Sequence, residues 1–318
     1  MTRLTDLRRK TRSLFEIPLM YLGIAIAPLL PRAVVVGLAV IFGEVAFLVS
    51  RRTRRISRAN LGVAFGDRLT PAEKRRIARA SCRSLARVAL DLFWFSRWTR
   101  KRITKYVAFD SSCDQTFRAR PAISVGGHLG NWEMLGQAVA LKDPPLLGIA
   151  AHLKNSTADS IVSRLRKGGN QQVVYKEGAA RASLKMLKTG GRVGLLLDQN
   201  VLPSEGGIFV EFFGLKVPMS SVAETLARRT GAPLAFGFCI PDGRGHYTVH
   251  SRELLTIEDS PGEGELTQKI ADILQEEVSR NPAYWVWMYK RWKLIPEGES
   301  PAGYPYYARP IRPLERRL

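Results

Sequence analysis

Two long apolar runs open the chain, and basic clusters flank them. Residues 13–31 and 33–50 are almost wholly apolar, whereas residues 3–12 and the stretch after Ser50 are rich in Arg. Each run approaches the roughly 20 residues that span a bilayer, but Glu16 and Glu44 argue against two clean spans. The flanking charges favour a hairpin or an interfacial segment with both ends cytoplasmic. A single span through the first run and a pair of buried core helices remain alternatives. No small-residue cleavage site follows the first run, so the segment is expected to be retained.

An amphipathic helix is predicted after these runs. Thr70-Pro71-Ala72-Glu73 supplies an N-cap, a proline in the first turn and the acid of a capping box. Behind it, apolar residues share one helical face: Ile77, Leu85, Val88 and Leu92. The first 60 residues are therefore interpreted as membrane-associating N-terminal helices, followed from residue 61 by a separate domain.

From about residue 121, short apolar runs alternate with helical patterns. Strands are predicted at 122–126, 145–150, 172–175, 192–197 and 233–240, with helices at 131–141, 156–168, 178–189, 218–230 and 263–280. This alternation predicts an α/β domain over residues 61–295, with a mostly parallel sheet and helices on both faces. Residues 246–254 alternate as an edge strand would. Residues 296–318 are basic and rich in proline, and this tail is expected to be disordered.

The charge balance narrows the choice of partners. The 318 residues include 49 Lys and Arg against 28 Asp and Glu, a net charge of +21. Such an excess suits a polyanion, either nucleic acid or an anionic membrane surface. The Arg clusters adjoin apolar helices, and no helix-turn-helix, zinc pattern or aromatic RNA-binding strand is present, so anionic membrane lipids are expected and nucleic acid is not. A membrane-tethered nucleic-acid-binding protein is the alternative from another class. The three scattered cysteines support neither a zinc site nor a disulfide framework.

The residues 122–140, AISVGGHLGNWEMLGQAVA, carry the candidate chemistry. A buried strand is predicted to end at Gly126-Gly127, followed by His128 and a helix that begins near Asn131. In open α/β sheets, ligands bind beyond the carboxyl ends of the strands. Glu133 lies five residues after His128, where its carboxylate can orient one imidazole nitrogen and leave the other to take a proton from a hydroxyl. Because no Ser or Cys stands in the motif, direct attack of an alcohol on a thioester is expected, without metal or cofactor.

The block GGHLGNWE resembles the signature of the lipid A biosynthesis acyltransferases, which belong to the lysophospholipid acyltransferase superfamily. The resemblance extends over roughly residues 15–295 and includes three further blocks: LLLDQNVLPSEGGIFVEFFG (195–214), NPAYWVWMYKRWK (281–293) and LKNSTADSIVSRLRKGG (153–169). It implies a glycerolipid acyltransferase-like fold. Two departures, Leu129 in place of an aromatic residue and the segment 216–218, leave the acid–base pair intact but bear on chain or acceptor preference.

The resemblance implies a role for individual residues. His128 would be the base and Glu133 its partner, while Arg164 would bind anionic groups or steady the oxyanion. Further substrate-binding positions are Asn131, Lys154, Asn155, Asp198 and Gln199. A solvated helix face for Arg164 and a capping or loop role for Asp198 remain open. The other histidines, His152, His246 and His250, are interpreted as structural, and Trp285, Trp287 and Trp292 as packing or interfacial aromatics.

The function expected from these features is O-acyl transfer at the cytoplasmic face of a bacterial inner membrane. An acyl carrier protein or acyl-CoA thioester would donate the chain, and a glycolipid, foremost a lipid A precursor, would accept it. The same chemistry on a phosphatidylinositol mannoside or a lysophospholipid is the alternative.

Overall fold

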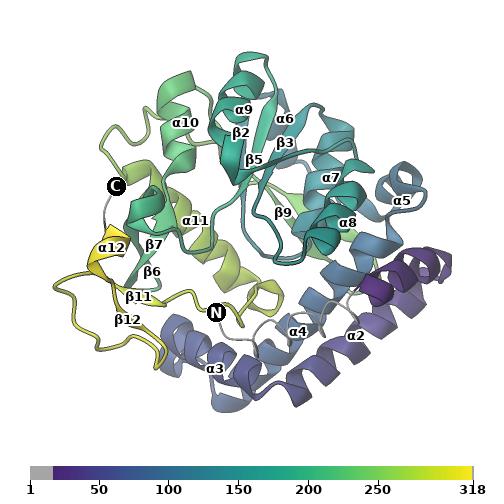
Figure 1. The fold of residues 1–318 in the computed structure, drawn as a ribbon, viewed down its shortest axis with the longest axis horizontal. Helices are drawn as coiled ribbons and strands as arrows, with labels where there is room; N and C mark the ends of the chain where they lie inside the picture. The colour runs from purple at the N-terminus through teal and green to yellow at the C-terminus, as the bar shows by residue number, and fades with distance from the viewer. Residues whose placement is uncertain (1–16, 317–318) are drawn as a thin grey trace.

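A five-stranded parallel sheet forms the centre of the molecule in the computed structural model, which describes residues 17–316. The strand order is β4-β3-β5-β2-β8 (Figure 1). The strands are β2 (Ala122–Gly126), β3 (Leu146–Ala150), β4 (Gln172–Tyr175), β5 (Arg192–Leu196) and β8 (Leu234–Phe236). Each joins the next through a helix, so all of the carboxyl ends lie at one edge. The predicted α/β class and mostly parallel sheet are confirmed.

Helices cover both faces of this sheet. One face carries α7 (Trp132–Lys142) and α8 (Ser156–Lys167), and the other carries α9 (Lys176–Lys188), α10 (Val222–Thr230) and α11 (Glu265–Arg280). The side chains of alternate strand residues point to opposite faces, and the large ones, such as Ile123 and Val193, pack toward α9, α10 and α11. The face beneath α7 has much smaller side chains, and the candidate site lies there.

Two smaller sheets adjoin the main one. Strand β10 (Tyr247–His250) lies between β1 (Val107–Phe109) and β9 (Phe238–Pro241), so the edge strand predicted at 246–254 is instead the middle strand of a second sheet. The strand predicted at 233–240 divides at Gly237 between β8 and β9. A hairpin of β6 (Gly207–Phe212) and β7 (Leu215–Ser220) also forms. It was not predicted, and it includes residues 218–220, which the sequence pattern assigned to a helix.

The N-terminal helices pack against one another. The helical segment Ile17–Leu29, α2 (Arg32–Val49), α3 (Arg51–Phe65) and α4 (Pro71–Trp94) precede the short α5 (Thr99–Tyr106) and α6 (Cys113–Arg118). The predicted capping box of α4 is present. Helix α2 lies along α4, and Gly43 permits the contact, because a Cβ there would overlap the Arg83 backbone. Glu44, the acid in the second apolar run, pairs with Arg79 and Arg83 of α4. The basic residues 3–12 and Glu16 lie outside the described residues.

The tail beyond residue 295 is folded onto the domain. Strand β11 (Leu294–Ile295) pairs with β12 (Arg309–Pro310), and α12 (Pro313–Arg316) follows. Ile311 is buried, and the Tyr307 hydroxyl donates a hydrogen bond to the Asn60 side chain of α3. The expected disorder is therefore wrong for residues 296–316, because aromatic and apolar side chains between the prolines supply contacts that a count of prolines does not reveal.

Candidate active site

His128 follows β2 at the carboxyl edge of the sheet, and its ring is anchored by Asp198. Nδ1 of His128 lies 2.7 Å from Oδ1 of Asp198, and the His128 backbone N–H donates to Oδ2 at 2.8 Å. Trp285 donates its indole N–H to the same Oδ2 at 2.8 Å. A Cβ on Gly127 would lie 3.2 Å from Cγ of Asp198, so glycine there permits the close approach. The imidazole is thus held in one orientation by a buried carboxylate that follows the neighbouring strand, β5.

Glu133 does not occupy the position expected for it. It lies in the first turn of α7 and accepts two hydrogen bonds from Arg166 of α8, at 2.9 and 2.6 Å. The expected hydrogen bond between Glu133 and His128 is absent from the described part of the chain, because Asp198 already occupies Nδ1. Arg164, expected to bind anionic groups, is exposed on the outer side of α8. Side chains two residues apart on a helix point in directions that differ by roughly 200°. Arg166 therefore reaches the site, and Arg164 does not.

The electrostatics of the pair favour a charged Asp198 and a basic His128. Burial alone lowers the pKa of His128, but the Asp198 carboxylate raises it, as does the charge of Glu133, and the net pKa lies above the ordinary value. Burial raises the pKa of Asp198, but the His128 ring and the indole of Trp285 lower it, and its pKa lies below the usual range. The imidazole is therefore a stronger base than one in water.

Within residues 17–316, no carboxylate contacts the second ring nitrogen of His128. Nε2 lies 3.3 Å from Nε2 of Gln199, an exposed side chain that also lines the adjoining cavity. This nitrogen can therefore accept a proton from a bound hydroxyl group while Nδ1 remains on Asp198. Of the two residues predicted here after β5, Asp198 faces Nδ1 of His128 and does not line the cavity, whereas Gln199 lies at Nε2 and lines it.

A large cavity of about 800 Å³ begins at His128 and continues beneath α7. Its floor is a row of small side chains across the sheet, because Gly148, Gly194, Ser124 and Ala235 stand side by side on four neighbouring strands. Leu135, Gly136 and Val139 of α7 form the roof, and Phe109, Phe117 and Arg192 lie among the lining residues. Small residues at alternate strand positions leave room between helix and sheet that larger residues would fill. The cavity is suited to a long apolar group.

Three other predicted substrate-binding residues lie outside the cavity lining. Asn131 is buried and donates hydrogen bonds to Asp91 (2.9 Å) and to the Tyr247 hydroxyl (3.0 Å) while capping α7. Asn155 caps α8, and Lys154 is exposed. Asn131 therefore has a structural position, because its polar atoms are used within the protein.

Asp91, which holds Asn131, is the centre of a buried polar cluster. Arg32 of α2 and the Tyr247 hydroxyl both donate to its carboxylate, and Arg87 lies 4.0 Å away. Two buried cations thus share one carboxylate. The cluster joins the N-terminal helices to the first turn of α7, three residues beyond His128.

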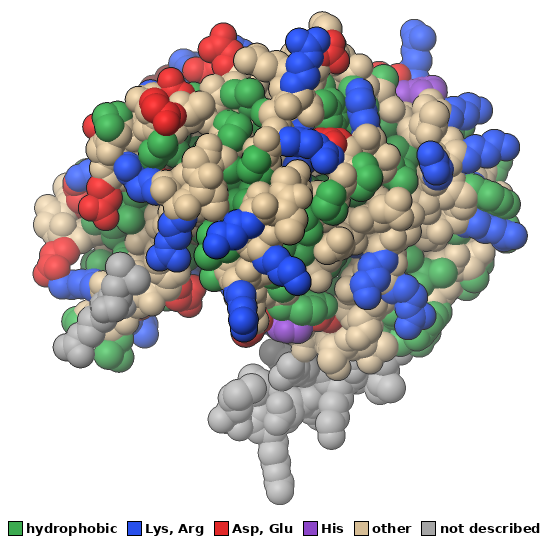
Figure 2. Space-filling view, turned by 90° about the horizontal axis from the view of Figure 1, so that it is seen from above, with side chains coloured by type: hydrophobic (Ala, Val, Ile, Leu, Met, Phe, Trp, Pro, Cys, Tyr) green, Lys and Arg blue, Asp and Glu red, His purple; other side chains and the backbone are tan. Residues whose placement is uncertain are grey.

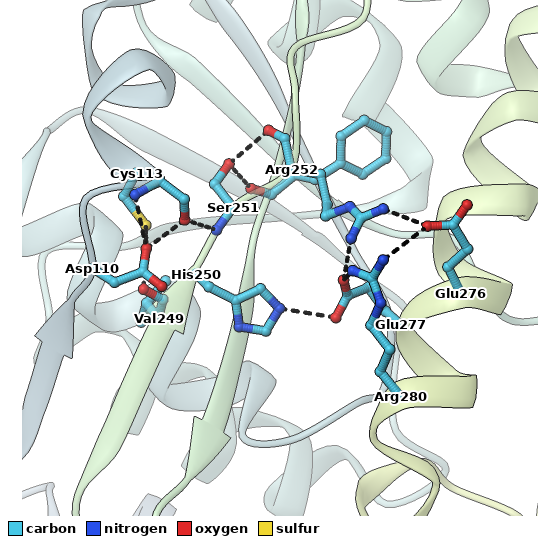
Figure 3. Close-up of polar contacts among 11 residues, drawn as sticks. Asp110, Cys113, Val249, His250, Ser251, Arg252, Glu276, Glu277 and Arg280 are labelled. Atoms are coloured by element: carbon cyan, nitrogen blue, oxygen red, sulfur yellow. Dashed lines mark hydrogen bonds and ion pairs between the residues drawn. The ribbon is translucent and has the colours of Figure 1, made fainter.

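The other histidines each have a carboxylate neighbour, but none lines the cavity. His250 is 2.8 Å from Glu277 of α11, within a network that includes Arg252, Glu276 and Arg280 (Figure 3). His152 pairs with Asp159 at 2.7 Å, and His246 lies 3.7 Å from Asp242. Trp285, Trp287 and Trp292 are buried in the core, where Trp285 also donates to Asp198.

Comparison with known proteins places this chain among the acyltransferases. The chain belongs to the bacterial lipid A biosynthesis acyltransferase family, whose model matches residues 7–294. The chain is 27% identical over 282 residues to the lipid A biosynthesis palmitoleoyltransferase of Escherichia coli K12, covering 85% of this chain and 89% of that protein. It is also 27% identical over 169 residues to the phosphatidylinositol mannoside acyltransferase of Mycobacterium tuberculosis H37Rv, about half of each chain. The crystal structure of the 1-acyl-sn-glycerophosphate acyltransferase PlsC of Thermotoga maritima is similar with a TM-score of 0.37 and 15% identity, covering 74% of this chain and 97% of that one.

Proposed function

We propose that this acyltransferase moves a fatty acyl chain from a thioester to a lipid hydroxyl, with His128 as the general base. The observation that carries the proposal is the combination of a carboxylate-anchored histidine with an apolar cavity that begins at its free nitrogen. Nε2 of His128 removes the proton of the hydroxyl as its oxygen attacks the thioester carbonyl. The tetrahedral intermediate then collapses, the C–S bond breaks, and His128 returns the proton to the leaving thiolate.

Asp198 is proposed to orient His128, and Glu133 to act on it through charge. The hydrogen bond at Nδ1 fixes the tautomer with an unprotonated Nε2, and the buried carboxylate stabilises the imidazolium as it forms. Glu133 keeps Arg166 neutralised beside the site and raises the pKa of His128. Gln199 is proposed to contact the substrate beside Nε2.

The cavity beneath α7 is proposed to hold the acyl chain of the donor. Burial of each methylene in an apolar space stabilises the bound donor by about 0.8 kcal/mol. The chain would enter beside His128, so its thioester carbonyl would remain at the carboxyl edge of the sheet, where the hydroxyl of the acceptor can reach it.

We infer a membrane-surface location from α2. Among the described residues it is the one helix long and apolar enough to cross a bilayer, with a mean hydropathy of 2.2. One side packs on α4, while apolar side chains on the other side are exposed, among them Ile41, Phe42, Val45 and Leu48. A helix held along α4 in this way suits an interfacial position better than a span. Glu44 is consistent with this, because it faces α4 and not lipid.

Basic residues support contact with anionic partners. Arg55 and Arg58 of α3 and Lys74 of α4 line a surface pocket of about 430 Å³ beyond the C-terminal end of α2, where anionic lipid headgroups would lie. Figure 2 shows Lys and Arg side chains spread over much of another face of the molecule, with acidic side chains mainly toward one side. An acidic acyl carrier protein is the proposed donor, with acyl-CoA as the alternative.

The proposed acceptor is a lipid A precursor at the cytoplasmic face of a bacterial inner membrane. The family match spans nearly the whole chain, whereas the similarity to the phosphatidylinositol mannoside acyltransferase covers about half of it. The mannoside and lysophospholipids are the alternatives with the same chemistry.

The test is acyl transfer by purified, detergent-solubilised protein. Radiolabelled acyl carrier protein and acyl-CoA donors are offered with a lipid A precursor, a phosphatidylinositol mannoside and lysophospholipids. Product on one acceptor, lost in His128→Ala, would establish both reaction and acceptor. Full activity of a correctly folded His128→Ala protein would contradict the mechanism.

A further inference from the structure

The side chain of Gln171 crosses the cavity beneath α7. A Cβ placed on Gly136 of α7 would lie 2.9 Å from its Oε1, and a Cβ placed on Gly148 of β3 would lie closer still to its Nε2. The amide therefore fills a gap that exists because two facing residues have no side chain. Any larger residue at either position would displace it.

No hydrogen bond in the described part of the chain anchors this amide. The side-chain amide of Gln171 makes none of the hydrogen bonds found among the described residues, although it lines an otherwise mainly apolar cavity and the residue is half-buried. A primary amide in such a space gives up hydrogen bonds to water without replacing them. Its rotamer is set by packing alone, so an apolar ligand of sufficient length can displace it.

The amide of Gln171 lies between Gly136 in the roof of the cavity and Gly148 in its floor. Gly136 lies one helical turn beyond Trp132, a lining residue in ring contact with His128. The cavity then continues to Phe117 and Arg192, near the amino end of β5. Arg192 is fully buried and is fixed there by Asp143 and by the carbonyl groups of Thr116 and Ala119. Gln171 thus occupies the space between roof and floor at Gly148, in a cavity whose lining extends from His128 to Arg192.

We propose that Gln171 determines which acyl-chain length the enzyme prefers. This inference rests on the proposed function, in which the donor chain occupies this cavity. Chains that stop short of Gln171 bind without disturbing it, whereas longer chains must displace an unanchored amide from the gap between Gly136 and Gly148. One methylene more or less in an apolar pocket changes discrimination by about tenfold or more, so a side chain of this size suffices to set a preference.

The experiment compares kcat/KM over a series of saturated acyl donors of increasing length. Gln171→Ala is expected to raise kcat/KM for a chain longer than the wild-type optimum, relative to kcat/KM for the optimal chain, by about tenfold or more. Gln171→Met, of similar length but apolar, should keep the wild-type cutoff, because the restriction is steric. Gln172→Ala is the matched control, since this neighbouring glutamine is exposed on β4 and does not line the cavity.

An unchanged length profile in Gln171→Ala, or an equal change in Gln172→Ala, would overturn the proposal. If Gln171→Ala does not fold, Gln171→Asn, which shortens the side chain by one methylene, should give a smaller shift in the same direction. Calorimetric binding of free fatty acids to the same proteins separates the two hypotheses. If the affinity depends on chain length and the Gln171 variants alter it, but no acceptor is acylated, the proposed function alone is refuted. If acyl transfer occurs and the Gln171 variants leave the length profile unchanged, the role of Gln171 alone is refuted.

Discussion

Replacing Asp198 by Asn tests which carboxylate serves His128. The two oxygens of Asp198 accept three hydrogen bonds, from the His128 ring, the His128 backbone N–H and the Trp285 indole. An amide has one oxygen. If that oxygen stays with the two N–H groups at Oδ2, the amide NH₂ faces Nδ1 and can only donate to it. Nδ1 then becomes the acceptor and the ring proton moves to Nε2, the nitrogen that must take the proton of the substrate.

The expected loss is large. An orienting carboxylate replaced by its amide in a serine protease lowers kcat about 10⁴-fold by the same change of tautomer, which corresponds to about 5.4 kcal/mol of transition-state stabilisation. We expect Asp198→Asn to lower kcat by a similar factor with little change in KM, because Asp198 faces His128 and not the substrate cavity. Glu133→Gln should lower kcat much less than Asp198→Asn does, because it weakens the base only through charge.

The assay is steady-state acyl transfer from a radiolabelled thioester donor, with circular dichroism to verify folding. Gln199→Ala, which alters the Nε2 side, serves for comparison and should change KM more than kcat. A folded Asp198→Asn enzyme that retains activity while Glu133→Gln abolishes it would refute the reasoning, and would mean that Glu133 takes over Nδ1 when substrate binds.

Three further outcomes are expected. The acidic limb of the pH profile of kcat/KM should lie above pH 6.5, because the pKa of His128 is raised and the base works only when it is neutral. Glu133→Gln should move that limb to lower pH. A limb at or below the ordinary histidine pKa would contradict this reasoning about charge. Asp91→Ala should lower the free energy of unfolding in urea by about 3–5 kcal/mol, because Arg32 and Arg87 would keep buried charges without a partner, whereas exposed Asp114→Ala should change little. Replacing Ile41, Phe42 and Val45 together by serine should weaken binding to vesicles roughly 100-fold, because each half-exposed side chain contributes about 1 kcal/mol. Leu314→Ser, at another exposed position, is the control. Equal binding by the triple variant and the wild type would show that α2 does not contact the membrane.

Part of the fold could be predicted because it depends on local periodicity. The strands at 122–126 and 172–175 and the helix beginning at Thr70 were predicted nearly to the residue, since apolar alternation and a capping box act over a few positions. The hairpin of β6 and β7 was not predicted, because Pro218 lies within β7 and interrupts the pattern that marks a strand. The tail was misjudged for a related reason: its order comes from contacts such as Tyr307 with Asn60, which are 247 positions apart.

In the candidate site, too, some features follow from local sequence and others only from tertiary contacts. The sequence by itself determined that His128 stands at the end of a buried strand, since Gly126-Gly127 and the cap at Asn131 are local signals. Only the tertiary structure decided that Asp198, 70 residues away, takes Nδ1, that Glu133 turns to Arg166, and that Arg164 faces solvent. Spacing along a chain limits which side chains can meet, but the parallel pairing of β2 with β5 brings two strand ends together. The small side chains beneath α7 became a cavity for the same reason, because a row of glycine, serine and alanine across four strands exists only when the strands are assembled.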